Sequence, residues 1–396
     1  MTWRRASVFI FVALASLTSA SALAQQSPFA PPPQTEPRYV KLLAFGDYFD
    51  AAALAEFEKA SGRQVAYDAY DSPDEVAGKM RDEPYDLIVM PAPALPEAIS
   101  SGALQKIDRA RLSHFSAVSP RVMAKLASYD PGGAYALPYM WFVTGLLMDA
   151  DKAKARLGAA PVSWGVLFSP ELARRFGDCG LAAPDDRDNL FVAAWKFMGT
   201  NLARLAPVDI RRAGDLILRL KAAARAFLAP DSVGALANGS VCVSIGREAD
   251  AGRAMERAKQ GGLDLTIRFA VPKEGAPMSI DAFVIPKNAP HLDDSYALLD
   301  FLLRPDIAAR NSRAAGAASG DEGGNDDLFK NLAPVAAMEP AQAALVSKEW
   351  LRVKAADNEA SSGGASKGAA KATSARQPAH AEIKKREAKP PRALSH

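Results

Sequence analysis

The sequence is poor in the residues and motifs that enzymes use for catalysis. Its 396 residues include two cysteines and four histidines, and the histidines do not occur in H-E-x-x-H or another metal-binding spacing. A G-x-S-x-G nucleophile elbow between a strand and a helix is absent, as is a phosphate-binding P-loop. The sequence therefore predicts a protein that is not an enzyme and that carries no cofactor or metal.

The chain also has little excess of one sign of charge over the other. The formal net charge is +3, and two of the positive charges are Arg4 and Arg5 at the N-terminus. A body so close to neutrality does not favour binding to nucleic acid or to a membrane surface. We therefore expect no nucleic-acid partner.

The first apolar segment of the chain is short. Arg4 and Arg5 precede this segment, at 8–17, and an A-x-A cleavage site follows at 22–24, which is the pattern of a signal peptide. The segment is too short to span a bilayer as a mature helix, and a retained membrane anchor is the alternative. We predict that residues 1–24 are removed and that the mature protein is soluble and periplasmic.

The two cysteines, Cys179 and Cys242, form an even pair in a chain that we expect to be exported, so a disulfide is the default prediction. It would close a loop of about 63 residues and stabilise the fold by roughly 4 kcal/mol in the chain-entropy model. Two separate buried thiols, or a metal pair without its other ligands, are the alternatives.

Strand and helix patterns alternate from the start of the globular chain. Short apolar strands are expected at 39–44, 65–70 and 86–90. Between the first two, Asp50 is a helix N-cap and Gly62 a helix stop. This alternation predicts an α/β fold.

One apolar segment, at 134–148, is longer than a single strand requires. We interpret it as the chain crossing from one lobe to another, with 267–272 as the return crossing and 278–286 back in the first lobe. The predicted organisation is a leader at 25–37, lobe 1 at 38–144 and 269–312, lobe 2 at 145–268, a flexible loop at 313–328, a helical segment at 329–354 and a disordered basic tail at 355–396.

The stretch 236–250 has the strand, glycine turn and helix start that commonly border a ligand cleft. A short apolar strand ends at Gly246, and Arg247 and Asp250 open the helix that follows. Ligands of open α/β folds bind where strands end and helices begin. An acidic residue in the first turn of a helix also complements the helix dipole, so Asp250 has a structural explanation as well.

Several segments in order resemble the periplasmic spermidine/putrescine-binding protein family, in particular its putrescine-binding type, which serves polyamine ABC transporters. The resemblance extends over about 39–354 and is strongest at 65–80, 137–145, 236–246 and 271–306. It implies a periplasmic binding protein type II fold, in which two α/β lobes joined by crossing strands close on a ligand. It also implies an inner-membrane ABC permease as partner, and it favours the disulfide, because the family carries a bridged pair in these two contexts. We expect a monomer.

The ligand positions of the family are only partly retained. Tyr48, Asp250 and Asp281 are kept, whereas Arg247 and Ser279 stand where the family has aromatic residues. The resemblance places the ligand-binding site at Phe45, Asp47, Tyr48, Asn189, Arg247, Asp250, Ser279 and Asp281.

Other positions no longer carry the side chains that contact the ligand in the family. Asn189 replaces a glutamate, with Asp188 beside it, and the first-strand aromatic has become the smaller Phe45. The serine-rich turn after the third strand is Pro91-Ala92-Pro93 here, and a late tyrosine is missing near Ala317. We therefore expect most of the aromatic box to be lost.

These replacements change what the pocket can hold. Each buried ammonium of a diamine needs a carboxylate, and aromatic walls add cation–π attraction of about 0.5–2 kcal/mol each. Asp250 and Asp281 can serve an ammonium. Arg247 in the cleft would repel a cation and could bind a carboxylate through two hydrogen bonds. It could instead neutralise Asp250 or Asp281, or point to solvent.

Two functions are compatible with this sequence. The first is a solute-binding receptor of an ABC importer, with a diverged pocket for an amine-bearing small ligand. The second is a periplasmic sensory or scaffold module with a degenerate cleft and no role in transport. Stabilisation by a bound ligand separates the two, because only a receptor gains free energy of unfolding from its solute.

Overall fold

The computed structural model describes residues 38–158, 162–229, 231–317, 326–334 and 338–363. Apart from Arg38, these residues belong to one unit of the chain, Tyr39–His396. The predicted signal peptide, the leader at 25–37 and the end of the predicted tail lie outside the described residues. In the described part, no helix is both long and apolar enough to cross a membrane.

An eight-stranded mixed sheet organises the fold, in the order β2-β1-β3-β9-β4-β7, with β10 beside β9 and β8 beside β4. Its strands are β1 (Arg38–Phe45), β2 (Arg63–Tyr70), β3 (Leu87–Pro91), β4 (Ala136–Asp149), β7 (Val243–Arg247), β8 (Ile267–Ala270), β9 (Pro277–Val284) and β10 (Ala333–Pro334). Two short strands, β5 (Ala182–Ala183) and β6 (Ala226–Phe227), pair with each other.

Helices connect and cover these strands. They are α1 (Ala51–Ser61), α2 (Pro73–Asp82), α3 (Leu95–Ser100), α4 (Pro120–Leu126), α5 (Ala150–Leu157), α6 (Gly165–Phe168), α7 (Pro170–Arg174), α8 (Arg187–Met198), α9 (Pro207–Ala223), α10 (Ser232–Ala237), α11 (Glu248–Gln260), α12 (Leu292–Leu302), α13 (Pro305–Ala315), α14 (Asp326–Asn331) and α15 (Pro340–Gly363). The expected ends of α1 are confirmed. The Asp50 side chain accepts a hydrogen bond from the Ala53 N–H, and Gly62 ends the helix in the left-handed conformation, with φ 68°.

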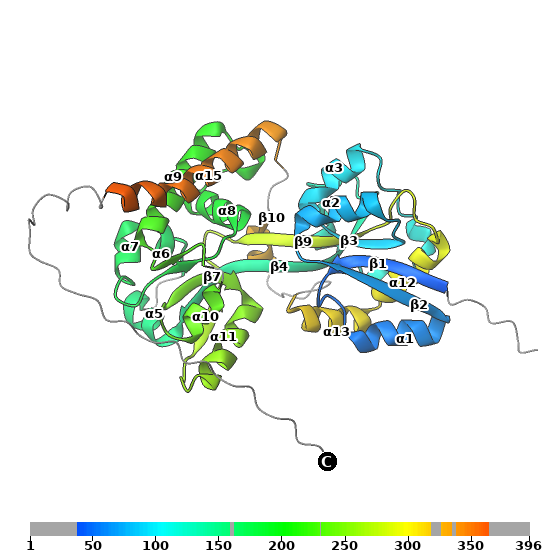
Figure 1. Cartoon of the computed structure of the whole chain (residues 1–396), viewed down its shortest axis with the longest axis horizontal. Coiled ribbons are helices and arrows are strands. Elements are labelled where there is room, and N and C mark those ends of the chain that lie inside the picture. The colour runs from blue at the N-terminus through cyan, green and yellow to red at the C-terminus, as the bar shows by residue number, and fades with distance from the viewer. Residues whose placement is uncertain (1–37, 159–161, 230, 318–325, 335–337, 364–396) are drawn as a thin grey trace, which may run out of the picture. The chain divides into compact units, whose positions relative to one another are not determined.

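The long strand β4 pairs with two parts of the sheet in succession. Its residues 136–143 pair with β9, and 144–148 pair with β7. Figure 1 shows β4 and β9 side by side. The apolar segment at 134–148 is thus largely one strand, and its crossing between lobes stays a prediction.

The return crossing predicted at 267–272 stays a prediction. This segment contains β8, which pairs with residues 146–149 at the far end of β4. The strand that lies between β3 and β4 is β9. An apolar run indicates a buried strand but does not indicate its partner, because pairing partners come from distant parts of the chain.

The division into two lobes stays a prediction, and the buried side chains support it. One apolar cluster comes from 40–142 together with 283–307, and another comes from 147–267. A third cluster combines residues from both groups, including Leu43 and Trp195. The crossing strands thus share a continuous core with the helices on either side.

The C-terminal part differs from the prediction at two places. Helix α13 continues into the predicted loop at 313–328, as far as Ala315, and α14 begins within it at Asp326. Helix α15 extends past 355, where we expected a disordered tail, to Gly363. Ala355 and Ala356 are strong helix formers, and lengthening an existing helix requires no new nucleation.

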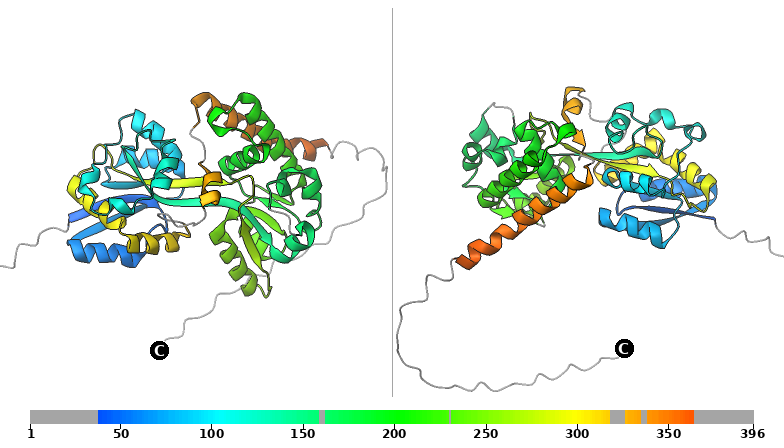
Figure 2. Two further views of the ribbon diagram at one scale, coloured as in Figure 1. Left: turned by 180° about the vertical axis from the view of Figure 1, so that it is seen from behind. Right: turned by 90° about the horizontal axis from the view of Figure 1, so that it is seen from above.

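Helix α15 packs against α9 (Figure 2). The Lys221 ammonium of α9 donates to the carbonyl of Val353 at 2.6 Å, and Arg352 pairs with Asp215 at 2.8 Å. The sequence pattern 329–354 had suggested a final helical segment but not its position. Its placement on α9 follows from these long-range contacts.

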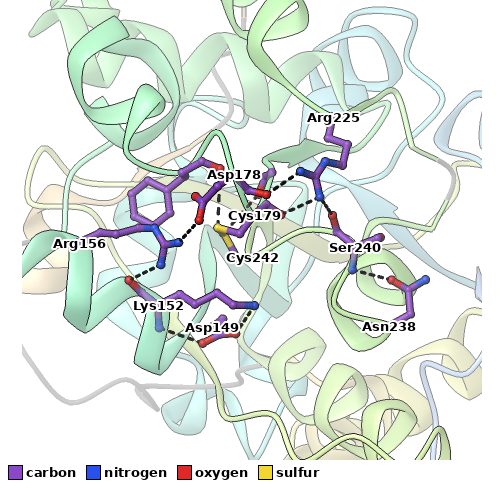
Figure 3. A network of polar contacts seen from close by, with 11 residues as sticks. Asp149, Lys152, Arg156, Asp178, Cys179, Arg225, Asn238, Ser240 and Cys242 are labelled. Carbon is purple, nitrogen blue, oxygen red and sulfur yellow. Dashed lines mark hydrogen bonds and ion pairs between the residues drawn. A yellow bond between two sulfur atoms is a disulfide. The ribbon is translucent and has the colours of Figure 1, made fainter.

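The predicted disulfide is present between Cys179 and Cys242, whose Cα atoms are 5.5 Å apart. Figure 3 shows how Arg225 reinforces the junction by donating to the carbonyls of Cys179 and Ser240. Gly180 follows the first cysteine with φ 88°, which a residue with a side chain rarely adopts. The bridge ties the segment after α7 to the start of β7.

Reduction of this disulfide is expected to lower the free energy of unfolding by roughly 4 kcal/mol, because the unfolded chain gains the freedom of a 63-residue loop. Urea unfolding with and without reductant measures the loss. A Cys179→Ala/Cys242→Ala variant is the control and should not respond to reductant. Two titratable thiols in the native, unreduced protein would contradict the bridge.

Candidate ligand-binding site

A cavity of about 420 Å³ lies where β4 leaves β9 and meets β7. Phe142 and Thr144 of β4 line it together with Ser279 and Asp281 of β9, and Arg247 closes it at the end of β7. Other parts of the lining come from the ends of β1 and β3 and the segments after them, and from the starts of α8, α10 and α11. The volume lies in the range of small-molecule sites, and the ends of β1, β3 and β7 are where ligands of α/β folds bind.

Aromatic side chains form one wall. The Phe45 and Tyr48 rings lie 5.2 Å apart, and those of Tyr48 and Phe142 lie 6.2 Å apart. Tyr129 also faces the cavity, from the turn after α4. Phe142 and Tyr129 were not among the predicted site residues, and they add rings to the lining beside Phe45 and Tyr48.

A buried carboxylate lies at the centre of this wall. Asp281 is only 6% exposed and accepts a 2.5 Å hydrogen bond from the Tyr48 hydroxyl. Burial raises the pKa of Asp281 to about 6, although the Tyr48 hydrogen bond and the charge of Arg247 both lower it. Burial and the neighbouring Asp281 also raise the pKa of Tyr48, so its hydroxyl stays a neutral donor. Tyr139 holds the Tyr48 backbone by donating to its carbonyl at 2.9 Å.

A second carboxylate faces the cavity from the start of α8. Asp186 caps this helix and accepts from the backbone N–H of Asn189 at 3.2 Å and from its Nδ2 at 2.7 Å. Burial raises the pKa of Asp186, and the Asn189 hydrogen bonds oppose this rise. The Asn189 Oδ1 atom is buried and has no hydrogen-bond partner within the described part of the chain. Asp188 also lines the cavity and pairs with Arg187.

The predicted site residue Asp250 is engaged in local structure. One carboxylate oxygen accepts from the Arg247 backbone N–H at 2.7 Å, and the other pairs with Arg253. The carboxylate thus caps the N-terminus of α11, as the helix-dipole explanation predicted. Asp250 lines the cavity but already has a cationic partner.

Arg247 points toward the cavity. Its guanidinium stacks on the Phe142 ring, with 4.7 Å between Cζ and the ring centroid. Its positive charge helps lower the pKa of Asp281 and of Asp186, in each case against the larger effect of burial. Of the proposed alternatives, neutralisation of Asp250 and a solvent-directed side chain do not fit this position, whereas partial neutralisation of Asp281 does. With Phe142, it also borders a second cavity of about 420 Å³ that is lined mainly by apolar side chains.

The remaining predicted positions divide into two groups. Phe45, Tyr48, Asn189 and Ser279 line the cavity, as do Pro91 and Pro93 of the turn that lacks polar side chains. Asp47 does not line it. The residue is exposed and has φ 61°, because the chain turns sharply after β1 and directs this position outward. Ala317 borders the second cavity instead.

Sequence reasoning missed Asp186, Tyr129 and Phe142. Asp186 has a recognisable signal, since an aspartate three residues before a helical Asn is a helix N-cap pattern. That signal indicates a helix start and not a ligand site. The described residues contain no group of three or more metal-ligating side chains that could hold an ion.

An α/β fold with an aromatic, carboxylate-lined cavity at the ends of its strands defines a small-molecule binding protein. Residues 52–320 match the family of bacterial extracellular solute-binding proteins, and the chain belongs to this family. Membership confirms the expectation of a binding protein that is not an enzyme.

Individual relatives extend this assignment. The putrescine/agmatine-binding protein of Pseudomonas aeruginosa is 34% identical over 315 residues, which are 78% of this chain and 84% of the relative. The putrescine-binding periplasmic protein PotF of Escherichia coli is 33% identical over 282 residues, covering 70% of this chain and 76% of PotF.

The fold has solved counterparts. The spermidine/putrescine ABC transporter substrate-binding protein PotD of Streptococcus pneumoniae superimposes with a TM-score of 0.68 at 20% identity. The alignment covers 80% of this chain and 98% of PotD. It confirms the predicted periplasmic-binding-protein fold.

The raised pKa of Asp281 predicts how the free energy of unfolding changes with pH. Because the folded protein binds this proton more tightly than the unfolded chain, the ionised carboxylate costs stability above pH 6, and the cost disappears as the pH falls toward 4. The cost is about 3 kcal/mol, at about 1.4 kcal/mol per pKa unit. Asp281→Asn should therefore exceed the native protein in stability at pH 8, by a margin that narrows on acidification.

Urea unfolding of both proteins from pH 8 to pH 4 measures that margin. Asp231→Asn is the matched control. A hydrogen bond from the Gly234 N–H lowers the pKa of Asp231, so its native carboxylate contributes stability that is lost on acidification. A pH-independent margin for Asp281→Asn would mean that Asp281 titrates normally.

Proposed function

We propose that this protein is the solute receptor of an ABC importer and binds an amine-bearing small molecule in the cavity between β4, β9 and α8. The observation that carries the proposal is the charge balance of the lining. Asp186, Asp188, Asp250 and Asp281 face a single cation, Arg247. A cavity with this surplus of carboxylates favours a cationic ligand.

Two of these carboxylates are available to the solute. Asp188 pairs with Arg187 and Asp250 pairs with Arg253. Asp281 and Asp186 have no ion-pair partner among the described residues, and both have raised pKa values because they are buried. An ammonium group would neutralise either of them and recover the desolvation cost of the buried charge.

The neighbouring groups complement an ammonium. The Asn189 Oδ1 atom next to Asp186 lacks a donor, and an N–H of the solute would satisfy it. The Tyr48 and Phe142 rings provide faces on which a cation and its methylene chain can rest, worth about 0.5–2 kcal/mol per ring. A short alkyl amine fits all of these features.

The relatives support the same chemistry. Both relatives are named as putrescine-binding proteins, and one of them also as an agmatine-binding protein. Both compounds are alkyl amines. By extension, we propose that the chain is exported by its N-terminal segment, acts as a monomer in the periplasm, and delivers its solute to an inner-membrane ABC permease when the two proposed lobes close around it.

A solute at a hundredfold excess over Kd should raise the free energy of unfolding by about 2.7 kcal/mol. We expect an alkyl amine to produce this stabilisation in a thermal-shift screen and Asp281→Asn to weaken its affinity at least tenfold, about 1.4 kcal/mol, because a charged hydrogen-bond partner is lost. Affinity should also fall below pH 6, where Asp281 becomes protonated.

Asp231→Asn again serves as the control, because this exposed carboxylate is paired with Arg257 away from the cavity. It should bind the amine as the native protein does. Equal binding by Asp281→Asn would show that Asp281 does not hold the amine. Absence of stabilisation by every amine would favour the sensory or scaffold module with a degenerate cleft.

A further inference from the structure

Arg247 is an unusual neighbour for an amine-binding site. It places a permanent positive charge on the wall of a cavity that otherwise carries carboxylates. A second ammonium on the solute would be repelled by this charge, whereas an anionic group would be attracted. A built-in repulsive element of this kind discriminates between ligands of similar shape.

The guanidinium is held in place but has free hydrogen-bonding capacity. The pairing of Thr144 with Arg247 fixes the backbone of this residue, and the Phe142 ring supports one face of the guanidinium. None of the hydrogen bonds and ion pairs between described residues uses its N–H groups, since only the backbone N–H of Arg247 donates, to Asp250. A half-buried guanidinium with unused donors is a two-point binding site for a carboxylate.

The carboxylates that line the same cavity require a group of the opposite charge. Asp281 and the pair Asp186–Asn189 provide hydrogen-bond acceptors that have no cationic partner among the described residues. Arg247 provides donors that have no anionic partner there. Both sets of groups line the same cavity of about 420 Å³. One molecule that carries both charges can satisfy both sets at once.

On the basis of the proposed function, we propose that the solute is a zwitterionic aminocarboxylate, whose ammonium binds at Asp281 and Asp186 and whose carboxylate binds Arg247. Arg247 is then the specificity-determining residue of the site. A diamine of the same length would place its second ammonium against the guanidinium and bind more weakly.

Calorimetry with matched pairs of solutes tests this specificity on the mature, disulfide-bonded protein. The pairs are 3-aminopropanoate with 1,3-diaminopropane, 4-aminobutanoate with putrescine, and 5-aminopentanoate with cadaverine. In at least one pair we expect the aminocarboxylate to bind about tenfold or more tightly than the diamine, which is the effect of one charge-assisted contact. Tighter binding of the diamine in every pair would overturn the inference.

The Arg247→Gln variant should reverse the preference, with at least tenfold weaker binding of the aminocarboxylate and unchanged or tighter binding of the diamine. Arg247→Lys keeps the charge but lacks the planar two-point contact, so its affinity for the aminocarboxylate should be intermediate. The capping of α11 survives both substitutions, since it uses the backbone N–H of residue 247. An unchanged ratio of affinities in Arg247→Gln would refute the role of Arg247.

Arg257→Gln is the matched control. It removes the same charge from the helix that follows Arg247, at an exposed position that pairs with Asp231 and does not line the cavity. Both affinities should stay within about twofold of the native values, because exposed ion pairs contribute little. If the diamines bind best and Asp281→Asn abolishes that binding, the inference fails and the proposed function stands. If no member of any pair binds, both fail.

Discussion

The double pairing of β4 is the constraint on which the candidate site depends. Phe142 lies opposite Ser279 in the part that pairs with β9, and Thr144 lies opposite Arg247 in the part that pairs with β7. Directly after Thr144, Gly145 allows β8 to approach, since a Cβ atom there would lie 2.5 Å from the carbonyl oxygen of Ala270. A one-residue slip of β4 would turn these side chains to the other face and remove the cavity wall.

Electrostatics then divides the acidic residues of the cavity into two classes. Asp250 and Asp188 have arginine partners and contribute to local structure. Asp281 is buried and Asp186 is half-buried, and neither has an ion-pair partner among the described residues, so their ionised forms cost stability. A site that is destabilised when empty gains the most from a ligand of the opposite charge, which is why we propose the two unpaired carboxylates as the ligand-binding ones.

The same comparison of charge and hydrogen-bond partners applies to Arg247. Its charge partly offsets the cost of Asp281 and Asp186, but its donors remain unused, and its stacking on Phe142 holds it at the cavity wall. The site therefore combines both signs of charge over a short distance. Such an arrangement selects a solute by the order of its charged groups as well as by its size.

Local sequence signals were sufficient for the α/β alternation, for the ends of α1 and, together with the family resemblance, for the disulfide and the general position of the site. These features depend on short-range patterns such as apolar periodicity, helix caps and the spacing of motifs. The partner of β8, the course of α15 along α9 and the arrival of Tyr129, Phe142 and Asp186 at the cavity depend on contacts between distant segments. Only the tertiary structure decided those, because the energy of a pairing or a burial belongs to two parts of the chain at once and is not encoded in either part alone.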